Sequence, residues 1–392
     1  MDENPYGLRE RFEAMTGDAS PSPGLHARII AAAAARRRSR RYGILAGAAA
    51  LLVAAVLLPS LAPRTEPDEI AAVRTPTEPP GLIAPDAPKE LHAFLRPDPP
   101  ARIPVRTRDG RYFRVDALGE MGTVLGGTGF DADPYRATDD RLWLATPSDP
   151  VPAVAAATAP QSWARAAGSE LHAWAEPRGG AYDYQLMCVQ SGSTPRQVGT
   201  TGVTKGWPHP IRISGDVLVW TDETDVVRAA TGCAGEPREL RRSGRAVAFS
   251  HPYAYVADGR RLLRVDVRGG GAESTVAELP DGSVEDRPVI FAAAGDTVTW
   301  VAGRVLTVLA GRERRQVSLD SALAAQATDL TVGGRLVVLA ARPAETDPSH
   351  YAALVYDLRT GDTVRLAAEA YAADGWLLWR ERDAYSLARV AG

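Results

Sequence analysis

An apolar strand that follows a tight turn and ends in tryptophan or another large residue recurs seven times in this chain. Successive recurrences are separated by 31 to 46 residues. A repeat of about 40 residues with four short strands in each unit is the sequence signature of a β-propeller. The pattern therefore predicts an all-β propeller over residues 105–392. The repeats are marked by Trp143, Trp174, Trp220, Tyr255, Trp300, Leu339 and Trp379.

Most markers are followed by two further strand patterns separated by turn residues. The predicted third strands are Tyr184–Val189, Val226–Ala230, Leu262–Val267, Val305–Leu309, Leu354–Leu358 and Tyr385–Val390, and the predicted outer strands are Arg196–Val198, Arg238–Leu240, Thr275–Leu279, Arg315–Leu319 and Thr363–Leu366. The seventh unit lacks an outer strand, and Tyr112–Asp116 precedes the first unit. We predict that Tyr112–Asp116 completes the last blade, because closing the ring removes an open sheet edge. Seven blades are expected, with six and eight as alternatives because the first unit, residues 122–160, is irregular.

A stretch of 21 residues without a charge, Tyr42–Ala62, precedes this repeat region. At about 1.5 Å per residue a helix of this length matches the roughly 30 Å hydrocarbon core of a bilayer. Five arginines lie between residues 36 and 41, and acidic residues outnumber basic ones after the stretch. The positive-inside rule then predicts a single membrane span with a cytosolic amino terminus. A cleaved signal peptide is the main alternative, because the densest apolar run, Ile44–Leu58, has only 15 residues.

Two segments flank the predicted span. The Arg-rich tail, residues 1–41, carries Leu8, Phe12 and Met15 on one side of a short helical pattern, which would lie on the inner leaflet or dock on a cytosolic partner. The linker, residues 63–104, holds 11 of the 30 prolines and is expected to be an extended spacer. Its apolar patch, Leu91–Leu95, would form a turn of helix against the propeller.

Two segments of the repeat region carry a family resemblance. Val355–Asp362, with the sequence VYDLRTGD, and Leu263–Val267, with the sequence LRVDV, resemble the third strand and turn of WD40-like and TolB-like propellers. Together with the Arg-rich tail, the apolar segment and the Pro-rich linker, the whole chain resembles membrane-anchored propeller proteins of actinobacteria. The resemblance implies a propeller displayed on the outer side of the cell membrane.

Composition narrows the functional classes. The formal net charge is −3, which argues against a nucleic-acid partner. No nucleophile elbow, zinc-protease motif, phosphate-binding loop or dinucleotide fingerprint occurs, so neither a catalytic residue nor a metal or other cofactor is expected. The two cysteines, Cys188 and Cys233, lie about one blade period apart. In an oxidising compartment they would form one disulfide between adjacent blades, and two separate unpaired thiols are the alternative.

In a propeller, the loops from second to third strands and the links between blades gather on one face around the channel. Polar residues that converge on a concave face predict a binding site, although charged turn tips are also the ordinary solvated state of such loops. The best candidates are Trp207 and His209, which are held between Gly206, Pro208 and Pro210. The full set of candidate ligand-binding residues is Trp207, His209, Asp222, Asp225, His350 and Arg380.

Three functions are consistent with this layout. The leading hypothesis is a single-pass membrane protein that presents an extracytoplasmic propeller to a protein or cell-envelope ligand, and that is not an enzyme. The second is a transmembrane regulator of the anti-sigma type, in which the tail captures a cytosolic partner and the propeller senses a signal. The third is a secreted propeller hydrolase or lyase.

Overall fold

The computed structural model describes residues 91–129, 137–156, 163–178, 183–191, 193–204, 207–269, 272–280, 289–341 and 351–392. All described residues belong to one compact unit, Pro76–Gly392. The predicted tail and membrane segment, residues 1–62, lie outside the described residues. None of the helices in these ranges is long and apolar enough to cross a membrane.

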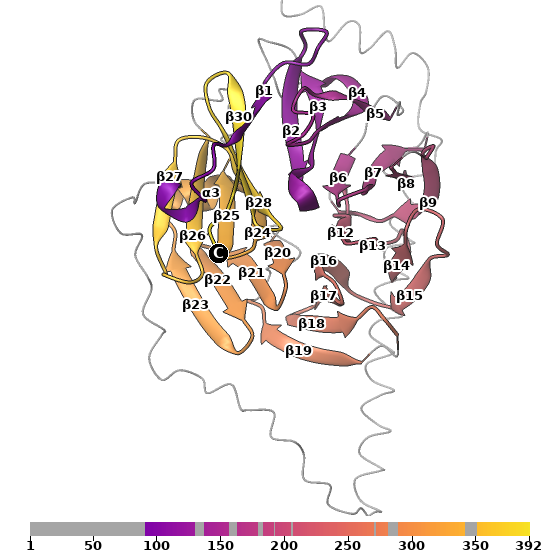
Figure 1. The fold of residues 1–392 in the computed structure, drawn as a ribbon. Coiled ribbons are helices and arrows are strands. Elements are labelled where there is room, and N and C mark those ends of the chain that lie inside the picture. The colour runs from indigo at the N-terminus through magenta and orange to yellow at the C-terminus, as the bar shows by residue number, and fades with distance from the viewer. Residues whose placement is uncertain are drawn as a thin grey trace, which may run out of the picture. The chain divides into compact units, whose positions relative to one another are not determined.

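Seven antiparallel sheets of four strands each surround a central axis and form the seven blades of a propeller (Figure 1). The prediction of an all-β, seven-bladed propeller is therefore confirmed. From the innermost to the outermost strand, the blades are β2 (Tyr112–Leu118), β3 (Val124–Gly129), β4 (Ala137–Ala145) and β5 (Ala153–Ala156) in blade 1; β6 (Trp163–Ala167), β7 (Leu171–Pro177), β8 (Tyr184–Gln190) and β9 (Arg196–Thr201) in blade 2; β12 (Arg212–Ser214), β13 (Val217–Thr221), β14 (Val227–Thr231) and β15 (Arg238–Arg241) in blade 3; β16 (Arg245–Ser250), β17 (Tyr253–Asp258), β18 (Arg261–Asp266) and β19 (Glu273–Glu278) in blade 4; β20 (Ile290–Ala294), β21 (Thr297–Ala302), β22 (Val305–Ala310) and β23 (Glu313–Ser318) in blade 5; β24 (Ala327–Gly333), β25 (Leu336–Ala341), β26 (Ala352–Asp357) and β27 (Thr363–Leu366) in blade 6; and β28 (Ala370–Ala373), β29 (Trp376–Arg380), β30 (Ala384–Arg389) and β1 (Ala101–Pro104) in blade 7.

The remaining elements are short and connect or flank blades. They are the 3-10 helices η1 (Leu91–Phe94) and η2 (Glu120–Gly122), the helix α3 (Ser321–Gln326), and the two-stranded ribbon of β10 (Val203–Thr204) and β11 (Trp207–Pro208). The predicted turn of helix at residues 91–95 is thus present, and Phe94 is buried on the propeller.

Blade 5 shows how the sequence produces each sheet. β20 and β21 are joined by a tight turn in which Gly295 has a φ of +59°, a conformation that favours glycine. The second strand, with Trp300 almost fully buried, is covered on both faces by the neighbouring blades. The outer strand β23 instead carries charged residues and is largely exposed at its start. Burial therefore falls from the second strand to the outer strand.

An aspartate at the end of a third strand shapes the following turn. The Oδ1 atom of Asp357 accepts a hydrogen bond from the backbone N–H of Arg359 at 2.8 Å. In blade 4 the Oδ1 atom of Asp266 accepts one from the backbone N–H of Arg268 at 2.9 Å. Aspartate favours such turns because its short side chain reaches the backbone two residues ahead. This contact is the physical basis of the strand-and-turn motif seen in the sequence.

Hydrophobic clusters lie between adjacent blades and hold the ring together. The described residues form seven clusters, one for each of the seven interfaces. The cluster between blades 2 and 3 is built on Trp220 and Leu186, for example, whereas the cluster between blades 1 and 2 has only four buried members. These four are Leu125, Leu142, Trp174 and Val189.

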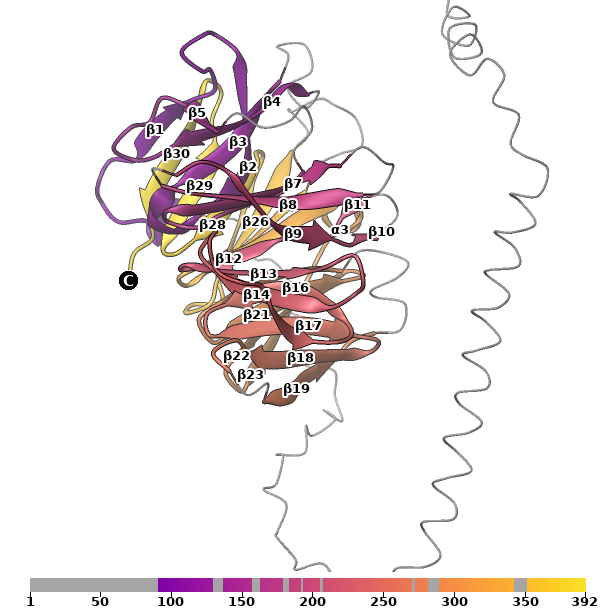
Figure 2. The ribbon, with the colours of Figure 1, turned by 90° about the vertical axis from the view of Figure 1, so that its right-hand side faces the viewer.

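The strand that closes the ring differs from the prediction. Figure 2 shows β1 beside β30, and the two pair in antiparallel register from Ala101 opposite Leu387 to Pro104 opposite Ala384. β1 is therefore the outer strand of blade 7. The predicted closing strand, Tyr112–Asp116, belongs to the innermost strand of blade 1 and pairs with β3. The prediction was wrong because the Pro-rich composition before residue 105 concealed a strand, and an edge strand tolerates proline.

The irregular first unit has a related explanation. The repeat pattern predicts that Trp143 marks a second strand, but Trp143 lies in β4, the third strand of blade 1. Its second strand, β3, has the sequence VLGGTG and carries no large aromatic residue. The propeller also begins before the predicted boundary at residue 105, because η1 and β1 pack on blade 7.

Candidate functional site

The innermost strands of all seven blades line a central channel with a cavity of about 280 Å³. Small side chains leave this space open, because alanines from β6, β16, β20 and β28 face it together with residues of β2, β12 and β24. The lining extends to the turns between first and second strands at Gly119 and Gly295. The channel therefore reaches the face opposite to the one that the sequence predicted for the site.

A half-buried cation, Arg212, lies in the channel wall. The Nε atom of Arg212, in β12, donates a hydrogen bond to the backbone oxygen of Val247 in the next blade at 3.0 Å. Burial lowers the pKa of the Arg212 guanidinium below its usual range, and the carboxylate of Asp329 opposes this effect. Asp329, in β24, also lines the cavity. The wall thus carries a charged group of each sign.

Three further carboxylates line the channel, at or near the turns between first and second strands. Each accepts a hydrogen bond from a backbone N–H or an arginine. Asp116 accepts a hydrogen bond from Nε of Arg114 at 2.9 Å. Glu120 accepts one from the backbone N–H of Gly215 at 2.7 Å and so connects blade 1 to blade 3. Asp374 accepts one from the backbone N–H of Met121 at 3.4 Å and connects blade 7 to blade 1. Acidic groups outnumber basic ones in this lining.

The predicted residue Asp222 serves a turn of blade 3. Its carboxylate accepts hydrogen bonds from the backbone N–H and hydroxyl of Thr224 at 2.8 and 2.7 Å, and from Nε of Arg228 at 2.5 Å. Burial would raise the pKa of Asp222, but these hydrogen bonds outweigh it and hold the pKa below the usual value. Asp225 lies in the same turn, is exposed, and has a φ of +62°. These contacts give Asp222 a structural role.

His209 is also an interior residue. Its side chain is 3% exposed and packs against Gly202, where an added Cβ atom would lie 2.8 Å from two ring atoms. Burial, and next the charge of Arg245, lower the pKa of His209 to about 4. The imidazole is therefore neutral at neutral pH. Trp207 lies in β11, on the link between blades 2 and 3.

Two predicted residues remain, His350 and Arg380. His350 lies outside the described residues. The guanidinium of Arg380, at the end of β29, lies 5.4 Å from the ring centroid of Tyr112. The backbone N–H of Arg380 donates a hydrogen bond to the backbone oxygen of Glu369 at 3.0 Å. Blades 3 and 7 are not neighbours, so the structure does not gather His209, Asp222 and Arg380 at one interface between blades. Their role in ligand binding stays a prediction.

A buried carboxylate near Arg380 escaped the sequence analysis. Glu369 is 1% exposed and accepts hydrogen bonds from the phenol of Tyr385 at 2.7 Å and from that of Tyr371 at 3.5 Å. The Tyr371 hydroxyl also lies 3.5 Å from the backbone oxygen of Val115, across the interface between blades 7 and 1. Burial, and next Glu369, raise the pKa of Tyr385 well above its usual value, which keeps it a donor. A lone glutamate before a strand gives no signal in sequence, so this network could not be anticipated.

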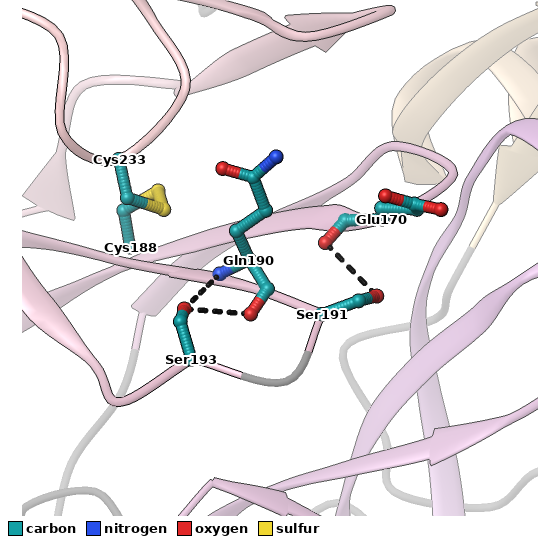
Figure 3. The surroundings of a disulfide bond; sticks show 6 residues. All are labelled: Glu170, Cys188, Gln190, Ser191, Ser193 and Cys233. Carbon is teal, nitrogen blue, oxygen red and sulfur yellow. Dashed lines mark hydrogen bonds between the residues drawn. A yellow bond between two sulfur atoms is a disulfide. The ribbon is translucent and has the colours of Figure 1, made fainter.

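Figure 3 shows the disulfide that joins Cys188 of β8 to Cys233, which follows β14. The Cα atoms are 5.5 Å apart, and both cysteines belong to the hydrophobic cluster between blades 2 and 3. The bridge expected from the spacing is therefore present, and neither cysteine is free. Next to it, the Ser193 hydroxyl donates to the backbone oxygen of Gln190 at 2.6 Å and orders the turn after β8.

The described side chains contain no group of three or more histidine, cysteine, aspartate or glutamate residues placed to hold a metal ion.

Comparison with known proteins finds neither a family nor a curated protein that matches the chain. Among solved structures, an oligogalacturonate lyase in complex with manganese matches with 12% identity and a TM-score of 0.44, over 76% of this chain and 98% of that chain. A streptogramin B lyase matches with 10% identity and a TM-score of 0.45, over 76% of this chain and 96% of that chain. At such low identity the likeness concerns the fold alone.

These matches correct one prediction. The missing hydrolase and nucleotide motifs led to the expectation that the chain is not an enzyme, yet both matched structures are named as lyases. The absence of those motifs is therefore no ground for excluding catalysis. Neither lyase activity is thereby assigned to this chain.

Proposed function

We propose that this chain is a single-pass membrane protein that presents its propeller outside the cytosol as a binding module for a protein or cell-envelope ligand. The central channel carries the proposal. Its cavity of about 280 Å³ is just below the usual size range of sites for small molecules, and a side chain or a short terminus of a larger ligand would fit. The lining carboxylates favour a ligand group with positive charge or hydrogen-bond donors.

The disulfide supports the proposed location. Both cysteines of the chain are paired, and such bonds persist in oxidising compartments but are rare in the cytosol. The 21-residue uncharged segment Tyr42–Ala62, with five arginines just before it, supports an anchor with this orientation. Together they favour an extracytoplasmic propeller attached to the membrane.

The experiment places a photo-crosslinking residue at Asp296, an exposed position on the turn beside the channel mouth, and illuminates intact cells. A second chain carries the crosslinker at Ser274, an exposed position of the outer strand β19. We expect a discrete adduct from position 296 and none from position 274. Ala293 lines the cavity, and the substitution Ala293→Phe fills it without removing a side-chain hydrogen bond.

The filled variant tests whether the ligand uses the channel itself. Ala293→Phe should abolish the adduct formed from position 296, whereas Ser274→Phe should leave it unchanged. No adduct at position 296, or an adduct that persists when the channel is filled, would refute the channel as the binding site.

A further inference from the structure

The outer strand of blade 1 differs in chemistry from those of the other blades. β5 has the sequence AVAA and carries no charged residue. Each of the other six outer strands carries at least one. Their charged residues include Arg102 in β1, Arg196 in β9, Arg238 in β15, Glu273 in β19, Arg314 in β23 and Arg365 in β27.

The exposed position of this strand is also apolar. Val154 is 42% exposed, and it is one of the two large hydrophobic side chains that are exposed among the described residues. It pairs with Trp143 on the inner side, in a sheet that ends at β5. A sheet edge presents backbone N–H and C=O groups that pair with other strands, and proteins prevent this with charged residues or proline. β5 has neither a charged residue nor a proline within Ala153–Ala156.

We propose that β5 pairs antiparallel with β5 of a second copy of this chain, so that the two blade 1 sheets form one continuous eight-stranded sheet across a two-fold axis. A strand without charges is complementary to itself, because neither copy has to bury an unpaired charge against the other. A charged peptide would find no ionic partner on Ala153–Ala156, which carries no charge. Pro152, which has no N–H, ends the paired segment on one side.

The interface is small, since four residues from each copy form it, and we therefore expect a weak dimer that depends on concentration. The test compares the full-length chain in detergent with the variants Val154→Lys, Val154→Thr and Ser274→Lys by sedimentation analysis. Threonine keeps a β-branched, uncharged residue on the edge. Ser274→Lys adds the same charge to the exposed outer strand of blade 4.

Val154→Lys should raise the dimer dissociation constant by about fivefold or more, and the other two variants should match the wild type. Hydrogen exchange provides the second readout, because the amides of Ala153–Ala156 should become more protected as the wild-type concentration rises. A wild-type chain that stays monomeric, a Val154→Lys variant that associates as the wild type does, or protection independent of concentration would each overturn the proposal.

Discussion

Removal of the Cys188–Cys233 bridge gives a quantitative test of the fold. The two residues are 45 positions apart, and the loop that they close contains β9 and the first three strands of blade 3. In the chain-entropy model, closing a loop of this length in the unfolded state stabilises the native state by about 4 kcal/mol. The cysteines are 0% and 7% exposed, so the bridge adds a covalent bond inside a core that already packs.

The expected effect is large enough to measure by calorimetry. A domain of about 300 residues has an unfolding entropy of about 0.6 kcal/mol/K, so the loss of about 4 kcal/mol should lower the Tm by about 6 °C. The double variant Cys188→Ala/Cys233→Ala removes the bridge and some packing. The matched control is the wild-type chain, reduced in urea and refolded with reductant, which loses the bridge but keeps both side chains.

The two samples separate the crosslink from packing. We expect the fall in Tm of the reduced wild type to be most of the fall in Tm of the double alanine variant. A reduced wild type that unfolds within about 1 °C of the oxidised protein would refute the reasoning, because it would show that the bridge adds no constraint beyond the packing between blades 2 and 3.

Three further predictions concern the closing strand, the buried glutamate and the buried histidine. A chain that begins at residue 91 should unfold cooperatively in urea, whereas a chain that begins at residue 105, and so lacks η1 and β1, should not. The shorter chain exposes the outer edge of β30. Equal cooperativity of the two chains would contradict the closure of the ring by β1. Tyr385→Phe should lower the free energy of unfolding by about 1.5–3 kcal/mol by removing a donor to the buried Glu369 carboxylate, and a loss under about 0.5 kcal/mol would refute this role. Burial holds the pKa of His209 near 4, below its unfolded value of 6.5, so the neutral imidazole contributes fully to stability above about pH 6.5. The free energy of unfolding should fall by about 3 kcal/mol as the pH is lowered from 6.5 towards 4. In urea titrations the free energy of unfolding of His209→Gln should depend less steeply on pH over this range, and an unchanged dependence would contradict the role of His209.

The repeat predicted the architecture well because turn chemistry and burial act locally in each blade. The outer strand Thr363–Leu366 has the predicted bounds, and the predicted third strand Tyr184–Val189 differs from β8 by one residue. Both follow clear turn signals. Blade 1 was misread because its second strand contains Gly126 and Gly127 in place of a large marker residue. β1 was missed because its pairing with β30 spans almost the whole domain and leaves no local pattern.

The site was harder to predict than the fold for a physical reason. The sequence shows which polar residues lie near turns, but it does not show whether their side chains are already hydrogen-bonded to the backbone of the turn. Asp222 is satisfied by its own turn, and His209 is enclosed by the link that carries it. Arg212 and Asp329 face the channel from strands that look like ordinary inner strands, so only the assembled ring reveals them. The disulfide could be anticipated because one blade period separates its cysteines.

The location of the propeller tests the central proposal most directly. A reporter that is active only outside the cytosol is fused after Gly392, and the same chain carries a tag at its amino terminus. The account predicts reporter activity in cells and a membrane-bound chain that keeps its amino-terminal tag. Activity from a matched reporter that works only in the cytosol, with an inactive extracytoplasmic fusion, would contradict the account.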